Sequence, residues 1–214
     1  MSARAIGLRQ GKAGFQVEWQ GASAGVELAV VGAHQVANAL AAAAVGLTLG
    51  LDLEVVAAAL SGATARSKWR MEIHHRPDGV TIVNDSYNAS PESMRAALRA
   101  LVALSGDASR RTWAVLGNMA ELGDRAAEIH DEVGRLAVEL DVSQLVVIGE
   151  RASGIHAGAM TARPGGEGVS AVTSLEDAFA LLSSRLEPGD VVLVKGSRAA
   201  GLDRLAALLC GEVQ

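Results

Sequence analysis

A β-branched apolar run gives way to polar side chains and then to a helix start in Val80-Thr81-Ile82-Val83-Asn84-Asp85-Ser86-Tyr87-Asn88-Ala89-Ser90-Pro91. Ser90 is suited to cap the following helix, because its hydroxyl can accept a hydrogen bond from a backbone N–H of the first turn. Pro91 suits the first helical position, where a missing N–H costs nothing. The residues from Asp85 to Asn88 therefore lie at the carboxyl end of a predicted strand, the edge at which open α/β sheets bind their ligands.

Strand-like and helix-like segments alternate around and after this stretch. The predicted strands are residues 69–74, 80–84, 112–116, 144–148, 169–172 and 191–194. The predicted helices are residues 92–104, 126–140, 152–160 and 202–209. A further helix is predicted to begin at a capping box formed by Thr173 and Glu176 and to end at Leu186. Such alternation predicts a Rossmann-like, doubly wound α/β fold with a mostly parallel sheet.

The first 65 residues have a different character. Residues 6–31 resemble short strands broken by glycines, which indicates antiparallel hairpins. Residues 37–51 and 53–60 are rich in Ala and Leu and predict two helices that are apolar on most faces and therefore buried. No sheet large enough to cover them is predicted nearby. We place a domain boundary near Ala65, with a partial α/β segment at residues 1–65 and the Rossmann-like domain at residues 66–214.

The amino-acid composition indicates which kinds of binding partner and which cellular compartment to expect. The net charge of −5 and the aromatic content of 3% argue against nucleic acid, which requires cationic and stacking side chains. The longest apolar run, residues 39–51, is shorter than the ~20 residues that span a bilayer, so we expect no membrane insertion. The absence of a signal peptide and the single Cys210 favour a reducing compartment, and we expect a cytoplasmic protein.

Several polar residues in these patterns are candidates for a binding site. Asp85 has a short carboxylate that could accept hydrogen bonds from two ribose hydroxyls, although a turn or cap role is the ordinary interpretation of an aspartate at such a position. Asn88 offers both a donor and an acceptor, and it could instead be part of the loop scaffold. Asn38 lies inside a predicted apolar helix, where it would need a buried hydrogen-bond partner, either a purine edge or a neighbouring carbonyl.

Two cationic segments complete the set of candidates. Arg70 precedes a predicted core strand, and its guanidinium suits bidentate phosphate recognition or a surface ion pair. Lys195 and Ser197 follow another strand with a glycine between them, an arrangement that suits anion or carboxylate binding or a solvated turn. The loop at residues 117–123 has glycines for close approach to a ligand, whereas His130 is interpreted as structural. No GxGxxG or GxxxxGK[ST] motif occurs, which weakens NAD binding and excludes autonomous P-loop chemistry.

Taken together, five segments resemble the Mur ligases, and most closely the MurF branch, which joins D-alanyl-D-alanine to UDP-N-acetylmuramoyl-tripeptide. These segments are residues 32–38, 68–72, 84–91, 116–123 and 194–198. The resemblance runs from about residue 25 to the C-terminus in the order and spacing of the family. It implies that residues 1–65 are the end of a central ATPase domain without its P-loop and that residues 66–214 are the C-terminal Rossmann-like domain.

The resemblance also implies roles for individual residues. Asn38 would contact adenine, Arg70 the phosphates of ATP and Asp85 the ribose. Lys195, Ser197 and Asn88 would line the side of the cleft that receives the dipeptide. Gln35 stands where the family usually has Asn, which affects an expected nucleotide contact, and Ser90 stands where it usually has another Asn.

The reaction implied is phosphorylation of a peptide carboxylate by ATP with Mg²⁺, followed by attack of the dipeptide amine. The P-loop lysine, the magnesium ligands and the UDP-sugar site would belong to N-terminal and central parts that this chain lacks. We therefore expect no ligase activity from the chain alone. An alternative is a standalone nucleotide-binding or partner-binding module without catalysis, and an oxidoreductase of the same fold is disfavoured by the missing glycine motif.

Overall fold

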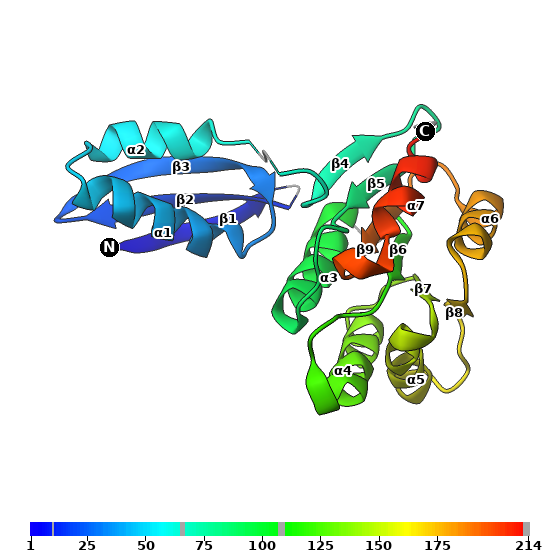
Figure 1. Cartoon of the computed structure of the whole chain (residues 1–214). Coiled ribbons are helices and arrows are strands. Elements are labelled where there is room, and N and C mark those ends of the chain that lie inside the picture. The colour runs from blue at the N-terminus through cyan, green and yellow to red at the C-terminus, as the bar shows by residue number, and fades with distance from the viewer. Residues whose placement is uncertain (10, 65–66, 107–109, 212–214) are drawn as a thin grey trace. The chain divides into compact units, whose positions relative to one another are not determined.

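The computed structural model describes residues 1–9, 11–64, 67–106 and 110–211 of the chain. The chain divides into two compact units, Met1–Arg66 and Ser67–Gln214 (Figure 1). The predicted boundary residue, Ala65, lies outside the described residues. Within the described part of the chain, no helix combines the length and apolar character needed to cross a bilayer.

The first unit is a three-stranded antiparallel sheet with two helices. Its elements are β1 (Ser2–Arg9), β2 (Lys12–Trp19), β3 (Ala22–Val31), α1 (Gln35–Thr48) and α2 (Leu53–Ser61), with the strands in the order β1-β2-β3 (Figure 1). Phe15, Val17 and Val26 on the sheet form one cluster with Ala39 and Ala57 on the helices. The antiparallel hairpins are as predicted, but the expectation that no local sheet could cover the helices is wrong, because alternate strand residues supply the apolar face.

The helices of this unit are only half buried. One stripe of α1 is buried, with Val36 and Ala39 against the sheet and Ala43 and Leu47 in a second cluster with Val56 of α2. Leu49 lies just beyond this helix and is 78% exposed. The prediction of buried helices is therefore wrong in part, since a three-stranded sheet can cover only one face of each helix and the Ala-rich sequence did not indicate which face.

The second unit is built on a six-stranded sheet in the order β4-β5-β9-β6-β7-β8. Its strands are β4 (Glu72–His75), β5 (Thr81–Asn84), β6 (Thr112–Leu116), β7 (Gln144–Ile148), β8 (Val169–Val172) and β9 (Val191–Lys195). Only the pairing of β4 with β5 is antiparallel. The first strand begins three residues later than predicted, because Trp69 and Met71 have positive φ angles of 61° and 50° that no strand accommodates.

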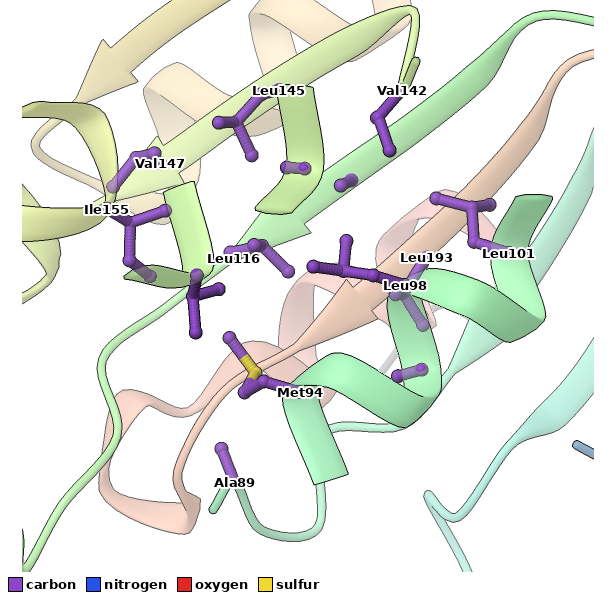
Figure 2. Packing of buried hydrophobic residues seen from close by; sticks show 14 of the residues in the cluster. Ala89, Met94, Leu98, Leu101, Leu116, Val142, Leu145, Val147, Ile155 and Leu193 are labelled. Atoms are coloured by element: carbon purple, nitrogen blue, oxygen red, sulfur yellow. The ribbon is translucent and has the colours of Figure 1, made fainter. Parts of the chain in front are cut away.

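Helices cover both faces of this sheet, which confirms the predicted doubly wound α/β class (Figure 1). The helices are α3 (Pro91–Ser105), α4 (Ala126–Glu139), α5 (Ser153–Ala162), α6 (Leu175–Arg185) and α7 (Leu202–Leu209), with short 3₁₀ turns at Gly123–Arg125, Glu150–Ala152 and Arg198–Ala200. One buried cluster joins α3, α4 and α5 to the sheet, and Figure 2 shows Met94, Leu98 and Ile155 within it. The other cluster joins α6 and α7 to the opposite face.

Helix starts follow the predicted cap chemistry at one position and depart from it at another. Ser90 and Ser93 form a reciprocal capping box at the start of α3, and Pro91 is the first helical residue. The predicted cap at Thr173 is wrong, because the adjacent Ser174 accepts the bond from the Asp177 amide. Thr173 and Ser174 both have hydroxyls, so the backbone geometry decides which of the two caps the helix.

Candidate functional site

The site is formed where three parallel strands end side by side. The Asp85 amide donates to the Val194 carbonyl at 2.9 Å, and the Gly117 amide donates to the Lys195 carbonyl at 2.8 Å. Beyond the strand ends, the Ser197 amide donates to the Asn118 carbonyl at 2.8 Å. These bonds gather the loops at residues 85–90, 117–123 and 196–200, which we call the carboxyl-edge loops. The sheet thus brings together segments that are more than 100 residues apart.

The carboxyl-edge loops surround a cavity of about 580 Å³. It is lined by residues 87–91, 120–122 and 197–199, with nearly equal polar and apolar character. Ala89 anchors the first loop, because its methyl group is buried in the same cluster as Met94 (Figure 2). The volume falls within the ~300–1,000 Å³ range of small-molecule sites.

Lys195 and Asp85 form an ion pair at the base of these loops. Lys195 Nζ donates to Asp85 Oδ2 at 2.6 Å and to the Asn88 carbonyl at 2.9 Å. The Lys195 side chain is only 2% exposed and that of Asp85 is 14% exposed. Two of the three donors of the ammonium are therefore already bound within the chain. The strand end points this side chain inward, toward Asp85 and Asn88.

Ser197 and Asn88 present polar groups to the cavity. Ser197 is 2% exposed, and its hydroxyl has no hydrogen-bond partner among the residues that the structure describes. Asn88 uses its Oδ1 atom to accept from the Ala89 amide at 2.8 Å. Unpaired buried hydroxyls are uncommon, so the Ser197 Oγ atom lacks a partner that a ligand in the cavity could supply.

Arg70 is held in a strained segment next to these loops. The Tyr87 amide donates to the Trp69 carbonyl at 3.0 Å, and the Met71 amide donates to Asp85 Oδ1 at 3.1 Å. The Arg70 guanidinium lies 4.3 Å from the centre of the Tyr87 ring. Arg70 is exposed and, among the described residues, has no carboxylate partner. Its hydrogen-bonding edge therefore remains free for an anion while the ring fixes its plane.

A second stacked pair was missed by the sequence interpretation. The Arg198 guanidinium lies 4.1 Å from the centre of the Trp69 ring, and Arg198 also lines the cavity. Trp69 lies next to Arg70 in the chain, so the two stacked pairs are neighbours through the backbone. Aromatic and cationic residues so far apart in sequence carry no local signal of contact, and only the fold reveals this pair.

His130 supports the loop at residues 117–123. Its Nε2 atom accepts from the Met119 amide at 2.9 Å, and its Nδ1 atom lies 2.6 Å from the Ala126 carbonyl. This pattern fits the neutral tautomer with the proton on Nδ1, since Nε2 must accept. His130 is 2% exposed, in line with the structural interpretation of the sequence.

Asn38 belongs to the first unit, Met1–Arg66. It is exposed on α1, and its Nδ2 atom donates to Gln35 Oε1 at 2.9 Å. The prediction that Asn38 needs a buried partner is wrong, because Asn38 lies off the buried stripe that contains Val36 and Ala39. Gln35 is the residue that departs from the family pattern. Its side-chain oxygen accepts this hydrogen bond and so orients the Asn38 amide.

Among the described residues, no three His, Cys, Asp or Glu side chains gather closely enough to hold a metal ion. Divalent metals of the magnesium type require several oxygen ligands. The geometry of this chain therefore supports no step through a metal held by its described residues alone.

The family model for the glutamate ligase domain of the Mur ligases matches residues 69–198. A UDP-N-acetylmuramoyl-tripeptide–D-alanyl-D-alanine ligase of Mycobacterium tuberculosis (strain CDC 1551 / Oshkosh) is 48% identical over 94% of this chain and 43% of its own length.

Solved structures agree with this match. The MurF structure from Acinetobacter baumannii has a TM-score of 0.85 at 30% identity and covers 98% of this chain and 44% of its own. MurF from Thermotoga maritima, solved in complex with ADP, has a TM-score of 0.79 at 25% identity, with 98% and 46% covered. The chain spans less than half the length of these relatives. By the family match over residues 69–198, the chain belongs to the Mur ligase family.

Proposed function

We propose that this chain forms the C-terminal portion of an ATP-dependent amide ligase that adds D-alanyl-D-alanine to UDP-N-acetylmuramoyl-tripeptide during peptidoglycan precursor synthesis in the cytoplasm. The observation that carries the proposal is the gathering of Asp85, Asn88 and Ser197 at one sheet edge beside a cavity of about 580 Å³. The relative from M. tuberculosis, 48% identical, bears the name of this activity.

One side of the site is assigned to the nucleotide. Arg70 has a free hydrogen-bonding edge and a guanidinium suited to phosphate oxygens. Each Asp85 oxygen accepts one bond within the chain and retains capacity for a ribose hydroxyl. Separately, in the first unit taken by itself, we assign Asn38 to contact with adenine, with its Gln35 partner orienting the amide. The MurF relative from T. maritima was solved with ADP, which supports nucleotide binding in this family.

The other side is assigned to the dipeptide. Ser197 Oγ is buried without a partner and lines the cavity. The Asn88 amide nitrogen has no hydrogen bond to another described residue, because only its oxygen is used for the loop. Both groups could bind the peptide unit or the carboxylate of a short substrate. Lys195 is withdrawn from direct contact here, because its ammonium is buried and bound to Asp85 and Asn88.

The reaction would proceed in two steps. The carboxylate of the tripeptide substrate would attack the γ-phosphorus of ATP, giving an acyl phosphate and ADP. The neutral amine of D-alanyl-D-alanine would then attack the acyl carbon, lose a proton and expel phosphate. Arg70 would offset negative charge on the phosphates, and this kind of charge stabilisation is often the largest catalytic term. Mg²⁺ would supply further charge neutralisation when bound.

The domain assignment follows from the same proposal. Residues 1–65 would be the end of the central ATPase domain, and residues 66–214 the C-terminal domain. The P-loop lysine, the magnesium ligands and the UDP-sugar site would come from the remaining part of a ligase whose relatives are more than twice as long as the match. The chain alone is therefore expected to be inactive.

Reconstitution tests this proposal. The chain is mixed with a separately produced N-terminal and P-loop portion of the ligase, and phosphate release is followed with ATP, Mg²⁺, UDP-N-acetylmuramoyl-tripeptide and D-alanyl-D-alanine. We expect release only when both protein portions and both substrates are present. Tight ATP binding by the chain alone, without turnover in this reconstituted mixture, would contradict the proposal and favour an independent binding module.

A further inference from the structure

Lys195 is the last residue of the central strand β9 and is almost completely buried. Its side chain is 2% exposed, and the other four residues of β9 are buried and apolar. A buried ammonium is costly unless it is paired and hydrogen-bonded. Lys195 meets this condition through Asp85 Oδ2 at 2.6 Å and the Asn88 carbonyl at 2.9 Å.

These contacts join three segments into one continuous network. The second oxygen of the Asp85 carboxylate accepts from the Met71 amide at 3.1 Å. The network therefore runs from the Asn88 carbonyl through Lys195 and Asp85 to the backbone beside Arg70. Met71 has a φ of 50°, a conformation that L residues seldom adopt without support from neighbouring contacts. A change at Lys195 is thus transmitted to both ends of the network.

We propose that Lys195 is a positioning residue that sets the Asp85 carboxylate and the Asn88 peptide in one fixed arrangement and does not itself bind a substrate. Two of its three ammonium donors are bound to Asp85 and Asn88, and Lys195 is not among the residues that line the cavity. Under the proposed function, on which this step rests, Asp85 faces the nucleotide and Asn88 faces the dipeptide. Loss of the ammonium therefore disturbs both substrate sites at once, whereas a direct dipeptide contact would disturb only one.

The network itself is tested on this chain without any substrate. Lys195→Met removes the charge and keeps a long side chain, and the exchange of the Met71 amide with solvent deuterium is followed by NMR. We expect exchange at least about tenfold faster than in the wild type, because the carboxylate that accepts from this amide loses its anchor. The same substitution made on an Asp85→Asn background should add little further exchange.

A stability-matched control separates positioning from general loosening. Leu182→Ala removes a fully buried side chain from α6, in the cluster on the face of the sheet opposite α3. It lowers stability but should leave Met71 exchange unchanged under conditions where the fold is fully populated. Unchanged Met71 exchange in Lys195→Met, or equal acceleration in both variants, would overturn the proposal.

Kinetics in the reconstituted mixture supply the second readout. Lys195→Met should raise the KM for ATP and the KM for D-alanyl-D-alanine together, each by about fivefold or more, while Leu182→Ala raises neither. An increase confined to the dipeptide KM would overturn the positioning role and return Lys195 to direct substrate contact. Failure of the wild-type mixture to turn over would count against the proposed function alone, because the exchange experiment decides the network independently.

Discussion

At the scale of single residues, stacking of Arg70 on Tyr87 makes a testable contribution to nucleotide binding. The guanidinium lies 4.3 Å from the ring centre, and such pairs at exposed sites contribute roughly 0.5–1 kcal/mol. Tyr87→Leu should therefore raise the KM for ATP of the reconstituted mixture by about two- to fivefold. Tyr87→Phe keeps the ring and serves as the control. Equal effects of the two substitutions would show that the ring does not orient Arg70.

Asp190 provides a residue-scale prediction about stability. It is 2% exposed and accepts from Arg111, from Trp113 Nε1 at 2.9 Å and from the Glu187 amide at 2.9 Å. The hydrogen bond that Arg111 donates to Asp190 raises the pKa of the Arg111 guanidinium above its ordinary value. Asp190→Asn should lower the free energy of unfolding by about 3 kcal/mol, because it leaves buried donors poorly paired.

Urea unfolding measures this loss against a matched control. Asp78 pairs with Arg76 at the surface, where its side chain is 46% exposed. Asp78→Asn should cost no more than about 1 kcal/mol, as is usual for exposed pairs. Similar losses from the two substitutions would contradict the structural role assigned to Asp190.

At the scale of elements, α4 and α5 pack closely enough to require glycine. A Cβ atom on Gly134 would lie 1.9 Å from the Ile155 carbonyl oxygen, which is backbone and cannot turn aside. Gly134→Ala should therefore destabilise the second unit by about 2 kcal/mol or more, because overpacking commonly costs 1–3 kcal/mol. Gly165→Ala, which would meet no atom within 4 Å, is the control. Thermal unfolding that shifts equally in both variants would refute this packing argument.

Some helices and strands were predictable from sequence patterns and others were not. The strands at residues 112–116 and 144–148 and the helix at 202–209 match the structure because buried runs and helical spacing are local signals. The predicted strand start at residue 69 is wrong because Trp69 and Met71 have positive φ angles. These angles depend on hydrogen bonds to the loop after β5, which the local sequence does not indicate. The exposed apolar faces of α1 and α2 could not be inferred, because an Ala-rich helix gives little contrast between its faces.

For the candidate site residues, too, the sequence predicted positions along the chain but not contacts between distant segments. The positions of Asp85 and Ser197 at strand ends were accessible from sequence, because strand boundaries and parallel topology are local or rule-governed features. The ion pair between Asp85 and Lys195 was not accessible, since it depends on β9 inserting between β5 and β6. This insertion places the Lys195 ammonium beside the Asp85 carboxylate.

At the scale of the whole molecule, the two compact units should unfold separately. The second unit has two extensive buried clusters, whereas the first leaves Val45, Leu49 and Val55 more than half exposed. Calorimetry should show two transitions, and residues 67–214 produced alone should retain the higher one within a few degrees. A single transition for the whole chain, or loss of the higher transition in the shorter chain, would contradict independent folding of the second unit.

The most direct test of the account is phosphate release by the reconstituted mixture with Asp85→Ala in this chain. The account predicts that kcat/KM for ATP falls at least about tenfold, because hydrogen bonds to a charged group contribute about 1.5–3 kcal/mol. Glu139→Ala, an exposed acid at the last residue of α4, should leave the rate unchanged. Wild-type rates with Asp85→Ala would contradict the claim that the carboxyl-edge loops of this chain complete the ligase site.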